Sequence, residues 1–145
     1  MIRRVFLLPT LLGLVLCTFL LEDGHGAGLA EPPPPSSRLE LLLPDDDDAP
    51  LQDIQVAMPQ VSAQRQRTDF TRVAAEVVES AYEVRVVNGG SETLAVALRE
   101  VFASDWLVIS ESAPHVREAP NTIRWDLAAP AGGEAVLRYR VRVRD

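Results

Sequence analysis

The sequence predicts an all-β chain: a small immunoglobulin-like or fibronectin-like antiparallel β-sandwich of about six or seven strands. Apolar and polar residues alternate with a period of two through much of residues 51–145, as in strands with one buried face. Turn-forming Gly, Pro and Asn residues separate these stretches at roughly 8- to 12-residue intervals, which is typical of sandwiches. The segment also has about the length of one such domain. We therefore expect a single β-sandwich domain over residues 51–145.

The composition limits the chemistry open to this chain. Its 145 residues are 47% hydrophobic and 24% charged, which fits one globular domain with appendages. All of the basic residues are Arg, so Schiff-base catalysis and a lysine-dependent phosphate loop are excluded. The single Cys, Cys17, lies in the N-terminal apolar segment, so the rest of the chain can form no disulfide. We expect no cofactor, no metal and, given the net charge of −7, no nucleic-acid partner.

Residues 1–30 have the pattern of a secretory signal peptide, which we expect to be helical. Arg3 and Arg4 precede an apolar run from Val5 to Leu21, and small residues lead up to an expected cleavage site after Ala30. The sequence therefore predicts an exported protein of the periplasm, the cell surface or the extracellular space. The apolar run is also long enough for the leader to remain as an uncleaved membrane anchor, which would be the chain's one contact with the membrane.

Residues 31–50 predict a disordered spacer. Pro32–Pro35 and Asp45–Asp48 favour an extended chain, and six acidic residues against one Arg place most of the net negative charge here. The contiguous Asp residues lack the alternating spacing and the glycine turn of a calcium loop. We expect this spacer to hold the sandwich away from a membrane or a partner.

The first part of the domain is the least clear. Residues 51–61 fit an edge strand that bends near Pro59. Apolar residues between Phe70 and Ala81 fit a helical stripe as well as a strand. The run of Val residues that begins at Val77 favours a long strand.

The second part of the domain shows clearer alternation. Residues 81–88 and 94–98 alternate on either side of Gly89–Gly90, which predicts a hairpin. Shorter strands are expected at 106–110 and at 122–127, where Ile123, Trp125 and Leu127 share one face. Residues 130–133 (Pro-Ala-Gly-Gly) then predict a turn into the last strand.

The last strand carries the main candidate binding surface. Apolar residues from Ala135 to Val143 alternate with Arg138, Arg140, Arg142 and Arg144, which places four guanidinium groups on one face. Arginine binds carboxylate and phosphate groups well, so this face could bind an anionic glycan or a partner protein. The alternative is cross-strand pairing with Glu79, Glu83 or Glu92, which we favour.

A series of short motifs from residue 66 onward follows a recognisable order. They are Gln66–Phe70, Tyr82–Asn88, Arg99–Glu100, Asp105–Trp106, Glu111–Ser112, Pro114–His115, Pro130–Glu134 and Tyr139–Arg142. Together they resemble the C-terminal end of the mucoidy-inhibitor-A-like family of bacterial proteins, a domain of unknown function. The resemblance implies an exported bacterial β-sandwich and supplies no catalytic residues. Family members are several times longer, with a coiled-coil-like N-terminal half and a larger β domain that the leader and spacer replace here.

Other polar and aromatic residues offer weaker candidate sites. His115, near Asp105, Ser110 and Ser112 in the sequence, could belong to a hydrolase, but no strained nucleophile turn is present. With Met58 it makes a poor ligand set for copper.

Two pairs of residues could serve sugar chemistry or sugar binding. Glu111 and Glu118 could act on a glycosidic bond, although surface charge is the simpler interpretation. Trp106 and Trp125 could stack on a sugar, but we expect Trp125 in the core and Trp106 in the core or as a loop lid.

These observations favour a non-catalytic interaction module of the bacterial cell envelope. We expect a protein partner, or a second copy of the chain, to bind at an open sheet edge or on the arginine-rich strand face. The alternative is a surface protein that binds carbohydrate or another polyanion.

Overall fold

The computed structural model describes residues 37–45 and 49–144. The predicted helical leader, the cleavage site after Ala30 and Asp46–Asp48 of the predicted spacer lie outside these residues. No helix in the described part is long and apolar enough to cross a membrane.

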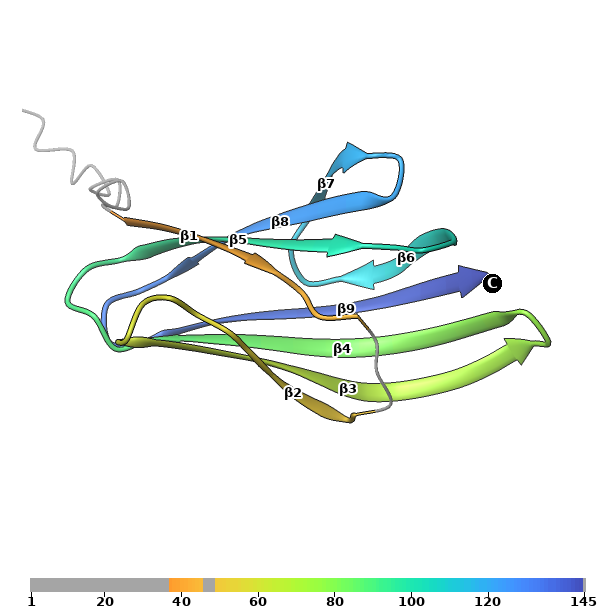
Figure 1. The fold of residues 1–145 in the computed structure, drawn as a ribbon, viewed down its shortest axis with the longest axis horizontal. Coiled ribbons are helices and arrows are strands. Elements are labelled where there is room, and N and C mark those ends of the chain that lie inside the picture. Colours follow the sequence, from red (N-terminus) through yellow and green to blue (C-terminus); the bar gives the residue numbers. More distant parts are fainter. Residues whose placement is uncertain (1–36, 46–48, 145) are drawn as a thin grey trace, which may run out of the picture. The chain divides into compact units, whose positions relative to one another are not determined.

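The described chain forms two β-sheets, which confirms the predicted all-β sandwich (Figure 1). Nine strands are described rather than six or seven: β1 (Ser37–Leu42), β2 (Leu51–Ile54), β3 (Val61–Ala74), β4 (Val77–Asn88), β5 (Leu94–Val101), β6 (Asp105–Glu111), β7 (His115–Ala119), β8 (Thr122–Ala129) and β9 (Glu134–Arg144). The four-stranded sheet has the order β1-β5-β8-β7, and the five-stranded sheet has the order β2-β3-β4-β9-β6.

The last five strands follow the connectivity of an immunoglobulin-like sandwich. Strands β5, β8 and β7 lie in one sheet and β6 and β9 in the other, as strands B, E, D, C and F do in that fold. The position beside β9, where the last immunoglobulin strand would pair, is taken by β4 from earlier in the chain. The pairings are antiparallel except for that of β1 with β5.

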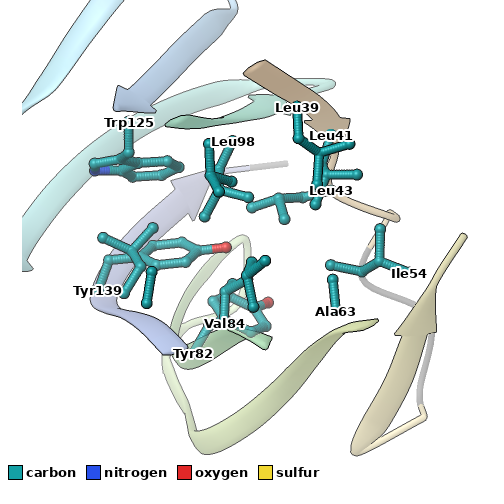
Figure 2. Packing of buried hydrophobic residues seen from close by; sticks show 14 of the residues in the cluster. Leu39, Leu41, Leu43, Ile54, Ala63, Tyr82, Val84, Leu98, Trp125 and Tyr139 are labelled. Carbon is teal, nitrogen blue, oxygen red and sulfur yellow. The ribbon is translucent and has the colours of Figure 1, made fainter. Parts of the chain in front are cut away.

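The predicted disordered spacer over residues 31–50 is wrong for residues 37–45. Strand β1 pairs in parallel with β5, and the Leu43 N–H donates to the Arg99 carbonyl at 2.7 Å. Leu39, Leu41 and Leu43 are buried in the core (Figure 2). The alternating leucines favour a strand more strongly than the flanking Pro and Asp residues oppose one, because burying each leucine side chain stabilises the fold by about 1.5–3 kcal/mol. The domain therefore begins before residue 51.

The predicted hairpin between residues 81–88 and 94–98 is also wrong. Strand β4 belongs to the five-stranded sheet, whereas β5 belongs to the four-stranded sheet. The Asn88 side-chain amide donates to the carbonyls of Glu92 and Ala129, at 2.8 and 3.0 Å. The Gly89–Gly90 segment is thus held as a crossover between the sheets.

The ambiguous stretch from Phe70 to Ala81 is strand, not helix. It is divided by a turn at Ala75–Glu76 into the end of β3 and the start of β4. The remaining predicted strands are confirmed within one or two residues at 106–110, 122–127 and 135–144, whereas the 51–61 strand ends at Ile54. Gly132 has a φ of 63° in the turn before β9, a conformation that favours glycine there.

Aromatic side chains fill one part of the space between the sheets. Trp125 is fully buried, as predicted, and its ring lies 4.6 Å from that of Tyr139, which in turn lies 5.2 Å from that of Tyr82 (Figure 2). Leucine and valine side chains from both sheets complete the core.

The role of β1 can be tested with two adjacent leucines. Leu41→Ala should lower the free energy of unfolding by about 3 kcal/mol, because it leaves a cavity in the core. Leu42 is 64% exposed, so Leu42→Ala should change it by less than about 0.5 kcal/mol. Urea denaturation of the 145-residue chain measures both values. Equal, negligible effects would contradict the placement of β1.

Candidate functional site

The four predicted arginines lie together on the outer surface of the five-stranded sheet. Arg138, Arg140, Arg142 and Arg144, here called the arginine face, alternate along β9 with core residues such as Tyr139 and Val141. Strand β9 lies between β4 and β6. The arginine face therefore meets side chains from both neighbours.

Three members of the arginine face form ion pairs. Arg138 Nε lies 2.8 Å from a Glu83 carboxylate oxygen, and Arg142 Nη2 lies 2.5 Å from Glu79. These partners stand directly opposite on β4. A hydrogen bond from Arg85, together with that from Arg138, holds the pKa of Glu83 below its usual value. Cross-strand pairing, the favoured alternative, is thus what the structure shows for Glu79 and Glu83.

The partner of Arg140 was missed by the sequence analysis. Arg140 Nη2 lies 2.5 Å from Asp69 on β3 and lowers the pKa of that carboxyl group. A bulge between Arg67 and Asp69 reverses the alternation of β3, so that Asp69 faces outward with Ala81. If alternate residues are counted from the start of β3 without the bulge, the Asp69 side chain is placed on the inner face of the sheet instead of the outer face.

The remaining residues of this surface behave differently. Of the expected partners, Glu92 contributes its backbone carbonyl to the Asn88 side chain. Arg144 lies opposite Asp105 on β6 but forms no ion pair with any carboxylate of residues 37–45 and 49–144. A groove of about 470 Å³ crosses the arginine face, where Ala81 and Ser110 leave room beside Arg138 and Arg140.

Strand β6 is an exposed edge next to the arginine face. It pairs with β9 on one side and with no described strand on the other. Leu107 is 56% and Ile109 41% exposed, and a hollow of about 240 Å³ lies between Leu107, Arg142 and Arg144. The unbroken apolar run from Trp106 to Ile109 could have revealed this surface, because such a run predicts apolar groups on both faces of a strand.

His115 belongs to a hydrogen-bonded cluster between the two sheets' edges. The carboxylate of Glu111 accepts from the Trp125 indole and contacts His115 Nδ1, both at 2.9 Å. Burial acts to raise the pKa of Glu111, but these hydrogen bonds outweigh it and hold the pKa below its usual value.

The residues of the suggested hydrolase are not assembled. Ser112 Oγ accepts a hydrogen bond from the Arg138 backbone, and the described part of the chain shows no hydrogen bond from His115 to Asp105, Ser110 or Ser112. Nor do the residues described include any group of three His, Cys, Asp or Glu side chains placed to hold a metal ion. Met58 packs against the hydrophobic core.

The carboxylates considered for glycosidic chemistry are both held ionised. Glu118 pairs with Arg99, 2.7 Å away, and with Arg124, and the Arg99 hydrogen bond lowers its pKa. The pKa of Glu111 is lowered as well. A glycosidase needs one carboxyl group with a raised pKa, and neither of these two provides it.

Trp106 does not present an open face for a sugar. Its ring stacks on Phe102 at 4.8 Å, and the Arg117 guanidinium lies over it at 4.4 Å from the ring centre. Its indole N–H donates to the Pro120 carbonyl at 3.2 Å. Trp106 thus packs at the border of the core from strand β6, rather than covering it from a loop.

Comparisons of the chain with family models, with curated proteins and with solved structures find no significant match. The resemblance to the mucoidy-inhibitor-A-like family stays a prediction.

The Glu111 cluster makes a specific prediction about pH. Because the folded-state pKa of Glu111 is lowered, ionised Glu111 stabilises the fold above the unfolded pKa of about 4.3, and this is lost as the pH falls through the folded value. Glu111→Gln should cost about 1 kcal/mol at pH 7. The difference from the parent should disappear near the acid end of a denaturation series. A difference that stays constant with pH would exclude this role.

Proposed function

We propose that this protein is an exported, non-catalytic interaction module of the bacterial cell envelope, which binds an extended segment of a partner protein at the free edge of β6. The single observation that carries the proposal is the exposure of Leu107 and Ile109 on an edge strand. A partner strand can add to such an edge through backbone hydrogen bonds, while its side chains meet the neighbouring surface.

The neighbouring surface indicates the character of the segment. Arg144 faces outward and forms no ion pair with a described carboxylate, although Asp105 lies opposite it on β6, and the hollow beside Leu107 is bounded by Asp105, Arg142 and Arg144. An added strand with alternating apolar and acidic side chains would cover Leu107 and pair with Arg144. Opposite charges on adjacent strands contribute about 0.2–1 kcal/mol per pair and set register more than affinity.

The other edges are less suited to strand addition. Of the three other edge strands, β2 has only four residues and β7 has five with a bulge after Arg117, while β1 has six residues and a single exposed apolar side chain, Leu42. Short or bulged edges are common protections against unwanted pairing. Strand β6 also has a bulge, but it is longer and carries two exposed apolar side chains.

The proposal that the protein is exported is based on its N-terminal sequence alone. The Arg pair, the apolar run and the small residues before Ala30 support transport across a membrane. In the domain that follows, the absence of Cys means that packing and ion pairs hold the fold in an oxidising compartment.

Site-specific photocrosslinking in the native cells tests the proposal. A photoreactive residue at Leu107 should give one main adduct with a foreign protein, and Ile109→Lys should abolish it, because a lysine on an edge opposes strand addition. The same probe at Leu42, which is as exposed but lies on the other sheet, is the matched control and should give none.

Three outcomes would overturn the proposal: no adduct at Leu107, equal adducts at Leu107 and Leu42, or an adduct that Ile109→Lys leaves intact. An adduct of twice the chain mass would replace the foreign partner with a second copy of the protein.

A second candidate function, binding of an anionic glycan, is favoured by the groove across the arginine face. Because three of the four arginines are paired with carboxylates, we expect weak retention on heparin at low salt. Arg138→Glu with Arg140→Glu should remove that retention, and Arg38→Glu with Arg124→Glu is the control of equal charge. Equal losses in both double variants would point to net charge rather than to the groove.

A further inference from the structure

A second candidate site lies between the two sheets, at the end where β5 and β9 finish. A cavity of about 370 Å³ is present there, which is within the roughly 300–1,000 Å³ typical of small-molecule sites. Its walls include Val78, Val141 and Val143 from the five-stranded sheet and Phe102 from the segment after β5. This cavity shares none of these residues with the exposed edge of β6.

Polar groups also line this apolar cavity. Ser80 on β4 is only 4% exposed, and its hydroxyl makes no hydrogen bond with any described residue. The Ser80 oxygen is not among the side-chain atoms sealed from solvent, so it is reachable from the cavity. The Glu100 carboxylate, on β5, lines the same space from the opposite sheet. A ligand in the cavity can therefore form a hydrogen bond with Ser80.

The charges around the cavity favour a cation. The two charged residues that line it, Glu100 and Asp45, are both carboxylates. The nearby cation, Arg65, directs its guanidinium at Glu100 and the Pro44 carbonyl, each at 2.5 Å, and lies over the Tyr82 ring. Arg65 does not line the cavity, but its pairing offsets the charge of Glu100, so the uncompensated negative charge that a ligand meets beside the apolar wall is that of Asp45.

We propose that this cavity binds a small aliphatic amine, with the ammonium group at Ser80 and Glu100 and the alkyl chain against Val78, Val141 and Val143. The ammonium group donates to the Ser80 hydroxyl oxygen and is attracted by the carboxylates. The alkyl chain removes apolar wall from water, at about 25 cal/mol per Å².

Hexylamine is a suitable probe. Titrated into the 145-residue protein at pH 7, it should shift the methyl NMR signals of Val78, Val141 and Val143 saturably. Hexanoate has the same chain length and should bind at least about tenfold more weakly, because its carboxylate meets like charges. No saturable shift, or equal affinity for the two probes, would overturn the proposal.

Two variants locate the binding. Ser80→Ala keeps the cavity but removes the hydroxyl, and should weaken hexylamine binding about two- to tenfold. Ser110→Ala, on the outer face of β6, is the matched control and should leave it unchanged. Val143→Phe fills the cavity and should abolish binding. If Val143→Phe does not fold, the Ser80→Ala variant decides the question. An unchanged affinity of this variant for hexylamine would show that the amine binds elsewhere and would overturn the proposal.

Discussion

One buried ion pair ties together the parts of this sandwich. Arg65 on β3 is 2% exposed and pairs at 2.5 Å with Glu100 on β5, in the opposite sheet. Its other terminal nitrogen donates to the Pro44 carbonyl just after β1, and its guanidinium lies 3.8 Å from the centre of the Tyr82 ring. Because an unpaired buried charge costs several kcal/mol, each of these elements is held in place by the others.

The packing of the interior differs between two regions. Near Trp125 and Tyr139 the space between the sheets is filled by aromatic and aliphatic side chains. Near Glu100 the space is left open and lined by polar groups. Burial, with a contribution from Glu100, raises the pKa of Tyr139 well above its usual value, so this phenol stays neutral in the filled region. The cavity therefore lies beside the buried ion pair and shares Glu100 with it.

The outer face of the five-stranded sheet is dominated by ion pairs rather than by buried apolar side chains. On the outer face of the five-stranded sheet, acidic residues of β3 and β4 pair with three of the arginines on β9. Exposed ion pairs contribute little to stability, with a typical value of about 0–1 kcal/mol each. They leave apolar Leu107 and outward-facing Arg144 beside β6 as the distinctive part of this face. An edge strand next to a neutralised sheet is well placed to select a partner.

The sequence was most informative where one face of a strand is buried. The alternation in β8 and β9 predicted the core side of Trp125 and Tyr139 correctly. It could not distinguish a hairpin from a crossover after Asn88, because both begin with the same turn residues. Strand β1 was missed because Pro and Asp dominate the composition around Leu39 and Leu41.

The candidate sites depend on contacts that no local pattern contains. Arg65 lies between Gln64 and Gln66 and has the sequence context of an exposed residue, so its burial and its pairing with Glu100 emerge only from the packing of two sheets. The outward position of Asp69 depends on a bulge. Leu107 and Ile109 were included in a predicted strand, but that prediction did not specify that the strand lies at an edge.

Amide hydrogen exchange of the isolated 145-residue protein tests this account most directly. It compares β1, which is held by its pairing with β5 and by the hydrogen bond from Arg65 to Pro44, with β6, whose outer edge pairs with no described strand. We predict that Leu39 and Leu41 exchange as slowly as the amides of β4, and that the β6 amides facing away from β9 exchange freely. Rapid exchange throughout residues 37–42 would contradict the pairing of β1 with β5. Full protection of β6 in the monomer would contradict the open edge on which the proposed function depends.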